Sequence, residues 1–261
     1  MALIEVTSLT KRFGGLMAVN DVSFSIDTGE IVSMIGPNGA GKTTAFNCVT
    51  GLYPITSGDV LFDGRSIAGQ PPHRITRLGV ARTFQNIRLF SYMTALDNVM
   101  VGAHWWMTSH VWDSVVRTRR ARADEKRVDQ RARDLLEQLG LARYAGSYAR
   151  ELPYGLQRRL EIARALATQP RILLLDEPAA GLNPQEKKEL MALIGRLRTE
   201  GLTIFLIEHD MKVVMEISDR IVVLDHGVKI TEGKPLDVRT NPQVIEAYLG
   251  QGAAEQMSGT S

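Results

Sequence analysis

Apolar residues recur along the chain with two different periods. Short β-type runs at residues 3–6, 22–26 and 59–62 are separated by turns rich in Asp and Gly, which predicts a small antiparallel region near the N-terminus. Continuous apolar runs predict buried strands, because a strand covered on both faces has no polar side to alternate with. These runs occupy residues 31–35, 172–175 and 203–207.

The segment between the last two runs carries helix signals at both ends. Asn183 is a predicted N-cap, Pro184 lies in the first turn, Glu186 completes a capping box, and Gly201 follows the end. One apolar face comprises Leu190, Leu193, Ile194 and Leu197. Strands that alternate with helices predict an α/β fold around a mixed or parallel sheet.

Residues 87–151 interrupt this alternation and predict an inserted helical subdomain. Helical spacing relates Val128, Ala132, Leu135, Leu136 and Leu139. Residues 117–133 are rich in both acidic and basic side chains, which favours a solvated helix face over a partner-binding patch. For Trp105, Trp106 and Trp112 a place in the subdomain core is favoured over a partner contact.

The sequence predicts one domain over residues 1–240, whose core comprises residues 1–86 and 152–240. A C-terminal extension, 241–261, follows, and its last ten or so residues are small and polar, which predicts disorder.

Composition and charge narrow the function classes. The 31 basic residues nearly cancel the 29 acidic ones, so the net charge of +2 provides no field for nucleic acid or an anionic membrane. The single cysteine, Cys48, predicts a small core residue in a reduced, cytosolic protein, and the first residues have no basic leader. No apolar run approaches the roughly 18 residues that span a bilayer, so any membrane role requires a partner.

A glycine-rich segment between a predicted buried strand and a helix fits the phosphate-loop pattern. Its glycines allow backbone N–H groups to turn inward around an anion, and the helix dipole adds positive potential. We expect Lys42 to reach the β- and γ-phosphates and the Thr43 hydroxyl to join a Mg²⁺ shell. The predicted nucleotide-binding residues in this segment are Gly36, Pro37, Asn38, Gly39, Ala40, Gly41, Lys42, Thr43 and Thr44.

Two carboxylates end the strand at residues 172–175. Ligands bind at this edge of open α/β sheets, so Asp176 is expected to support the metal and Glu177 to accept a proton from an attacking water. Without the other motifs, two adjacent carboxylates after a strand could equally cap a helix or lie at the surface without a function.

Taken together, these motifs resemble the ATP-binding cassette (ABC) family over about residues 3–235, in order and approximate spacing. The resemblance implies a P-loop NTPase core that binds and hydrolyses ATP with Mg²⁺. It further implies that Phe13 stacks on adenine, that Gln85 touches magnesium and the attacking water, and that His209 contacts the γ-phosphate. Lys42, Gln85, Glu177 and His209 are then the expected catalytic residues, and Thr43, Gln85 and Asp176 the expected metal-site residues.

The family's signature loop, normally Leu-Ser-Gly-Gly-Gln, is represented by a different sequence. The expected residues, which would act on a partner's ATP, are Pro153, Tyr154, Gly155, Leu156 and Gln157. Pro153 supplies neither a hydroxyl nor an N–H group, so we expect a weaker or rearranged closure with function retained.

This aromatic-glycine loop, the Arg82-Thr83-Phe84-Gln85 string and the late Ala247-Tyr248-Leu249-Gly250 string are similar to the ATP-binding subunits of branched-chain amino acid importers. The resemblance implies a second ATP-binding subunit, identical or different, two transmembrane permease subunits, and indirectly a solute-binding protein. It implies no nucleic acid and a place at the cytoplasmic face of the membrane. A groove for the permease is expected after Gln85, although core packing competes for its residues Ile87, Leu89, Phe90 and Met93.

Three alternatives remain. The same motor could serve urea, amides or other amino acids, because an ATPase subunit does not touch cargo. A regulator that binds ATP without turnover is compatible with Pro153. A chromosome-maintenance or DNA-repair ABC ATPase would need a long coiled-coil or zinc insertion, which the short insertion, the single cysteine and the low net charge disfavour.

Overall fold

A computed structural model describes residues 2–103 and 119–249 of the chain. The predictions for Trp105, Trp106 and Trp112 and for the disordered tail therefore lie outside the described residues. No helix in the described ranges is long and apolar enough to cross a membrane.

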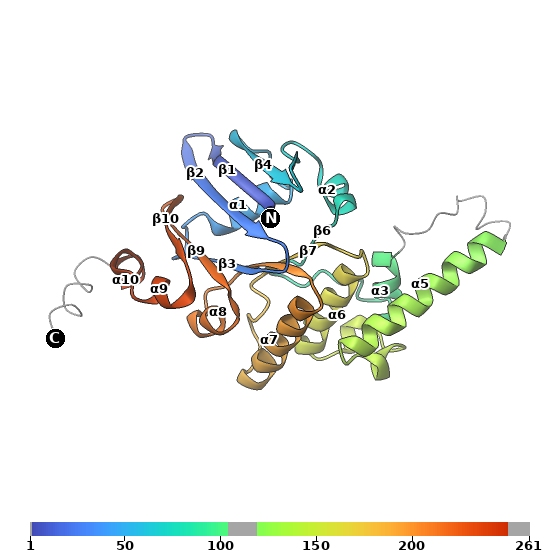
Figure 1. The fold of residues 1–261 in the computed structure, drawn as a ribbon. Helices are drawn as coiled ribbons and strands as arrows, with labels where there is room; N and C mark the ends of the chain where they lie inside the picture. The colour runs from blue at the N-terminus through green and yellow to red at the C-terminus, as the bar shows by residue number, and fades with distance from the viewer. Residues whose placement is uncertain (1, 104–118, 250–261) are drawn as a thin grey trace.

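The N-terminal strands form an antiparallel sheet, which confirms that part of the predicted fold class (Figure 1). In spatial order its strands are β2 (Leu16–Asp27), β1 (Ala2–Phe13), β4 (Ser57–Phe62) and β5 (Arg65–Ser66). The first two are longer than predicted, because register shifts at Val6/Leu9 and Leu9/Lys11 let the pairing continue where the apolar alternation breaks.

A second, mixed sheet of six strands forms the centre of the molecule. Its order is β10 (Val228–Gly233), β9 (Arg220–Asp225), β3 (Ile31–Ile35), β8 (Thr203–Ile207), β7 (Ile172–Asp176) and β6 (Val80–Arg82). All neighbours are parallel except β10, which pairs antiparallel with β9. The predicted α/β class is confirmed, and the three continuous apolar runs are the buried strands β3, β7 and β8.

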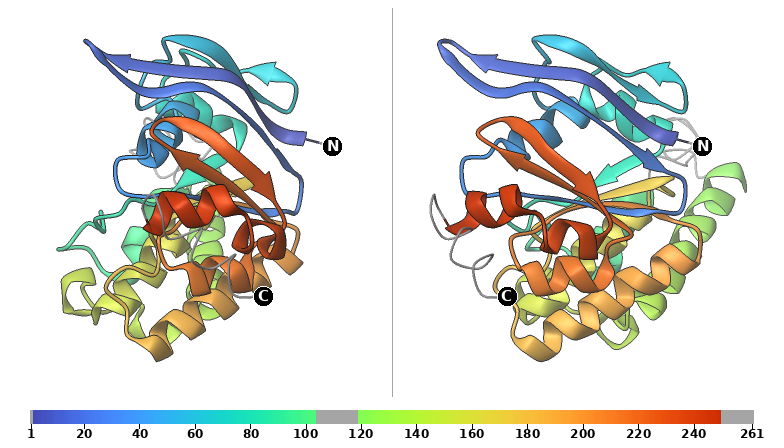
Figure 2. Two further views of the ribbon diagram at one scale, coloured as in Figure 1. Left: turned by 90° about the vertical axis from the view of Figure 1, so that its left-hand side faces the viewer. Right: turned by 60° about the vertical axis from the view of Figure 1, so that its left-hand side comes forward.

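Helices cover both faces of this sheet (Figures 1 and 2). They are α1 (Lys42–Val49), α2 (Pro72–Leu78), α3 (Ala95–Ala103), α5 (Arg119–Gln138), α6 (Tyr154–Leu166), α7 (Pro184–Thr199), α8 (Met211–Ile217), α9 (Pro235–Arg239) and α10 (Pro242–Leu249), with 3-10 turns at Ala142–Tyr144 and Ala149–Glu151. Helix α1 lies between the two sheets, where Phe205 of β8 packs against both Phe46 of α1 and Phe24 of β2 in one apolar cluster. Cys48 of this helix is buried, which raises the pKa of its thiol to about 11 and makes it an apolar core residue.

The other face is covered by α6 and α7, with α3 and α5 packed beyond α6. The capping box predicted at α7 forms: the Asn183 side chain accepts from the Glu186 N–H, and the Glu186 carboxylate accepts from the Asn183 N–H. The five predicted apolar positions, four on α5 and Leu139 just after it, are buried, while most charged side chains of α5 from residue 122 onward are exposed. Asp124 is buried, at 2% exposure, and it pairs with Arg127.

Candidate functional site

The phosphate loop connects the end of β3 to the start of α1. Gly39 and Gly41 adopt φ values of 85° and 94°, in the left-handed region that other residues rarely occupy. A Cβ on Gly41 would stand 2.4 Å from the carbonyl oxygen of Ala18. No side chain caps α1, so the N–H groups of its first turn remain available to an anion.

Lys42 is 8% exposed and folds over this loop. Its Nζ donates to the carbonyl oxygens of Gly36 at 2.7 Å and Pro37 at 2.9 Å. Burial lowers the pKa of Lys42, and the negative charge of Glu177 opposes that shift. A buried lysine beside uncapped N–H groups is an arrangement that can bind an anion. Thr43 follows with an exposed side chain.

Asp176 ends β7 and is 4% exposed. Burial raises the pKa of its carboxyl, and Arg82, whose Nη2 lies 3.2 Å from Asp176 Oδ2, opposes that shift. Arg82 is itself held through Nη1 by Asn47 at 2.7 Å and Thr50 at 2.9 Å. This pairing of Asp176 was not among the sequence predictions.

Three predicted catalytic side chains meet beyond the carboxyl ends of parallel strands. Gln85 Nε2 donates to Glu177 Oε2 at 3.1 Å, and His209 Nδ1 lies 3.6 Å from the same oxygen. They follow β6, β7 and β8, which are neighbours in the sheet. Glu177 has a φ of 47°, a costly conformation for a non-glycine residue that is often found at functional sites.

Phe13, at the end of β1, is 42% exposed. Tyr53 packs edge-on against it with ring centroids 5.3 Å apart, and Lys11 Nζ lies 4.7 Å from the Phe13 centroid. An exposed ring fixed from the side presents a face on which a planar base could stack. No sequence motif had indicated a role for Tyr53.

The signature-loop residues lie at the start of α6. Gly155 is buried, and a Cβ there would stand 2.8 Å from Glu186 Oε1. Gln157 Nε2 donates to the Leu152 carbonyl at 2.8 Å, and no side-chain cap closes the helix at Pro153. The hydrogen bonds of the described residues join none of this loop to residues 36–44 of the same chain.

Sequence reasoning missed a buried ion pair on the same helix. Arg158 donates to the carbonyl oxygens of Phe84 and Gln85, both at 2.8 Å, and to Glu161 at 2.9 Å. Tyr154 Oη also accepts from Arg158, at 3.1 Å. The available signal was two opposite charges one turn apart beside the apolar face of a helix.

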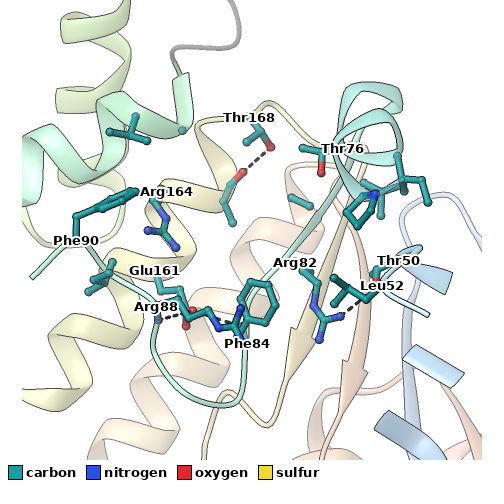
Figure 3. Close-up of a pocket in the computed structure, with 18 residues that line it drawn as sticks. Thr50, Leu52, Thr76, Arg82, Phe84, Arg88, Phe90, Glu161, Arg164 and Thr168 are labelled. Atoms are coloured by element: carbon teal, nitrogen blue, oxygen red, sulfur yellow. Dashed lines mark hydrogen bonds between the residues drawn. The ribbon is translucent and has the colours of Figure 1, made fainter. Parts of the chain in front are cut away.

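A groove of about 590 Å³ lies between α2, α3, α6 and the segment after Gln85. Figure 3 shows Arg88, Phe90 and Arg164 on one side and Thr50, Leu52 and Thr76 on the other. Of the four residues expected to form a groove after Gln85, Leu89 and Phe90 line this one, and Ile87 and Met93 do not. The segment is not a helix or strand, so its side chains share no regular face, and the Met93 side chain is 39% exposed.

Comparison with known proteins gives a consistent result. Residues 19–180 match the ABC transporter family, and residues 228–254 match the branched-chain amino acid ATP-binding cassette transporter family. The high-affinity branched-chain amino acid transport ATP-binding protein BraF of Pseudomonas aeruginosa is 52% identical over 95% of this chain and 98% of its own.

Solved structures resemble the whole fold. The ADP conformation of an ATP-binding cassette of an ABC transporter has a TM-score of 0.84 at 31% identity, covering 96% of this chain and 100% of that one. A dimeric post-hydrolysis cassette bound to ADP and Pi has a TM-score of 0.75 at 28% identity, covering 89% and 98%.

Proposed function

The chain belongs to the ABC transporter family as one of its ATP-binding cassettes, and we propose that it hydrolyses ATP to drive an importer of branched-chain amino acids. The observation that carries the proposal is the convergence of Gln85 and His209 on Glu177, in a chain whose phosphate-loop lysine is held 2.7 Å from a loop carbonyl. The names of its 50–52% identical relatives support the cargo class.

In the proposed reaction the loop N–H groups and Lys42 hold the β- and γ-phosphates of ATP. Glu177 orients a water in line with the γ-phosphate and accepts its proton, while Gln85 and His209 position that water and the phosphate. Phe13 carries the adenine ring. Lys42 and the loop N–H groups stabilise the charge that develops in the transition state.

The side chains assigned to Mg²⁺ fit that ion. Thr43, Gln85 and Asp176 supply oxygen atoms, and Gln85 uses Nε2 for Glu177, which leaves Oε1 for a metal. No group of three His, Cys, Asp or Glu side chains gathers among residues 2–103 and 119–249, which suits an ion held largely by water and phosphate. When bound, Mg²⁺ would neutralise charge between the β- and γ-phosphates.

We propose that the signature loop contacts the nucleotide bound to a second ATP-binding subunit. The start of α6 is uncapped yet is not bonded to its own phosphate loop, so its N–H groups can serve another chain's phosphates. A solved relative is dimeric with ADP and Pi, which supports this arrangement. Gly155 and the helix dipole would make the contact, without the hydroxyl that Pro153 lacks.

The groove in Figure 3 is the proposed binding site for a cytoplasmic segment of one permease subunit, and the second ATP-binding subunit would bind the other permease subunit. Its apolar walls suit an amphipathic helix, and the guanidinium groups of Arg88 and Arg164 favour an acidic side chain on that segment. This contact would hold the chain at the cytoplasmic face of the membrane, with a solute-binding protein acting indirectly.

The test is Mg²⁺-dependent ATP hydrolysis by the wild-type chain, alone and with its permease subunits in lipid vesicles, with uptake of labelled leucine and urea. Hydrolysis with leucine uptake is the expected result. Hydrolysis with uptake of urea but not of leucine would show that the ATPase drives import of another solute. ATP binding without hydrolysis, even with the permeases present, would favour a nucleotide-gated regulator, the alternative that Pro153 supports.

A further inference from the structure

The C-terminal helix α10 contacts the first residue of the phosphate loop. The backbone N–H of Gly36 donates to Tyr248 Oη at 2.8 Å, across 212 positions of sequence. Tyr248 belongs to the Ala247-Tyr248-Leu249-Gly250 string, to which the proposed reaction assigns no role. The string also lies inside the C-terminal family match at residues 228–254.

Helix α10 packs against β10 and α9, and it shares an apolar cluster with the strand that leads into the loop. Val244, 4% exposed, lies in an apolar cluster with Ile35, the last residue of β3, and with Val223 and Val238. The helix therefore shares an apolar cluster with Ile35 and contacts the next residue, Gly36, through Tyr248.

Helix α10 meets the loop at Tyr248 instead of packing along it. A cavity of about 710 Å³ separates the two elsewhere, lined by Asn38 and Gly39 of the loop and by Gln243 and Glu246 of the helix. In the described part of the chain, the Tyr248 bond is the one hydrogen bond that joins α10 to the loop. The position of the helix is thus transmitted to the loop mainly through one hydroxyl.

Gly36 has little freedom to take up a displacement. A Cβ at this position would stand 2.0 Å from the carbonyl oxygen of Leu224, so β9 closes one side of the residue. Its N–H is held by Tyr248, and its C=O accepts from Lys42 at 2.7 Å. Both backbone polar groups of this glycine are therefore fixed, one by the C-terminal helix and the other by the lysine assigned to the phosphates.

We propose that Tyr248 is a positioning residue of the nucleotide site: its hydroxyl fixes the first peptide of the phosphate loop and so sets the affinity for the phosphates of ATP. The proposal rests on the proposed function of the loop. Tyr248 acts through Gly36 and touches no reacting atom. Its loss weakens binding of both ATP and ADP more than it slows turnover, because Gln85, Glu177 and His209 are delivered by other strands.

The test uses Tyr248→Phe in the full chain, which keeps the ring and removes the hydroxyl. Loss of a neutral hydrogen bond changes an equilibrium constant by roughly 3- to 10-fold. The Kd for ATP and ADP and the KM for ATP should therefore rise by about that factor. The kcat should stay within about twofold of the wild-type value. Calorimetric titration and steady-state hydrolysis measure these quantities. Tyr144→Phe is the matched control, a half-buried tyrosine of the helical region that should change none of them.

A chain truncated after Leu249 keeps Tyr248 but lacks residues 250–261. It therefore distinguishes the effect of the Tyr248 hydroxyl from any effect of those later residues. Wild-type affinity in that chain, with weaker binding in Tyr248→Phe, supports the proposal. Wild-type affinity in a folded Tyr248→Phe, or a loss of kcat with KM unchanged, overturns it. If Tyr248→Phe lowers the unfolding midpoint of the nucleotide-free protein while its affinity per folded molecule stays wild type, the residue is structural and the proposal also fails. A wild-type chain that neither bound nor hydrolysed ATP would overturn the proposed function and this proposal with it.

Discussion

Arg158 and Glu161 lie one turn apart on α6, with Arg158 Nη1 2.9 Å from Glu161 Oε2 and side-chain exposures of 0% and 2%. Arg158 also binds the carbonyls of Phe84 and Gln85, and Glu161 accepts from the N–H groups of Phe84 and Arg88 at 3.3 Å. The pair therefore holds the segment that leads from the groove to Gln85. It connects the proposed permease seat to the proposed catalytic site.

Arg158→Met should lower the free energy of unfolding by about 3–5 kcal/mol, because it leaves the Glu161 carboxylate buried without its partner. Urea denaturation followed by circular dichroism measures the change. Arg159→Met is the control, since that neighbouring residue pairs with an exposed glutamate and its loss should change stability little. Equal stability of the two variants would contradict the structural role given to the Arg158–Glu161 pair.

Glu177→Gln should preserve ATP binding and reduce turnover about 10²-fold or more, since the amide cannot accept the proton of the attacking water. Phosphate release and nucleotide titration measure the two quantities separately. ATP should also hold this variant as a dimer, visible by light scattering. Hydrolysis at the wild-type rate would mean that another group is the base.

Arg82→Met should destabilise the protein more at pH 8 than at pH 4.5. Burial raises the pKa of Asp176 in the folded chain above its value in the unfolded chain. The free energy of unfolding therefore falls as the pH rises past the unfolded pKa and the buried carboxyl ionises. Arg82 offsets part of that fall by pairing with the carboxylate. Without Arg82 the ionised carboxylate is buried unpaired, at a cost of about 3 kcal/mol near neutral pH, and protonation in acid removes most of that cost.

Unfolding curves at the two pH values test this. Arg171→Met is the comparison, because Arg171 pairs with Asp63 at the surface, with side-chain exposures of 47% and 55%. That variant should change stability little at pH 8. A loss for Arg82→Met that was the same at both pH values would show that the arginine acts through packing rather than charge.

Phe90→Asp should reduce assembly with the permease subunits at least about tenfold, because it replaces an apolar ring of the groove by a carboxylate that would compete for Arg164. Co-purification of the tagged permease complex measures assembly. Met93→Asp is the matched control: Met93 is 39% exposed and close in sequence but does not line the groove, so assembly should persist. Normal assembly of Phe90→Asp would place the permease contact elsewhere.

Wherever the determining contacts were local, the sequence was sufficient. The Asn183–Glu186 box, the glycine-rich loop between strand and helix, and the buried runs β3, β7 and β8 each depend on neighbouring residues, whose spacing is visible in the chain. The same spacing predicted which apolar residues of α5 are buried. Spacing could not indicate which residues after Gln85 line the groove, because that segment is neither helix nor strand.

Only the tertiary structure decided the contacts between residues that are distant in sequence. Gln85, Glu177 and His209 meet because the sheet order places the ends of β6, β7 and β8 side by side. Arg82 reaches Asp176 across 94 positions, and Tyr248 reaches Gly36 across 212. Each of these side chains is ordinary by its own sequence context. Its role is fixed by which strand ends and helices the packed core brings together, and neither period nor local spacing encodes that information.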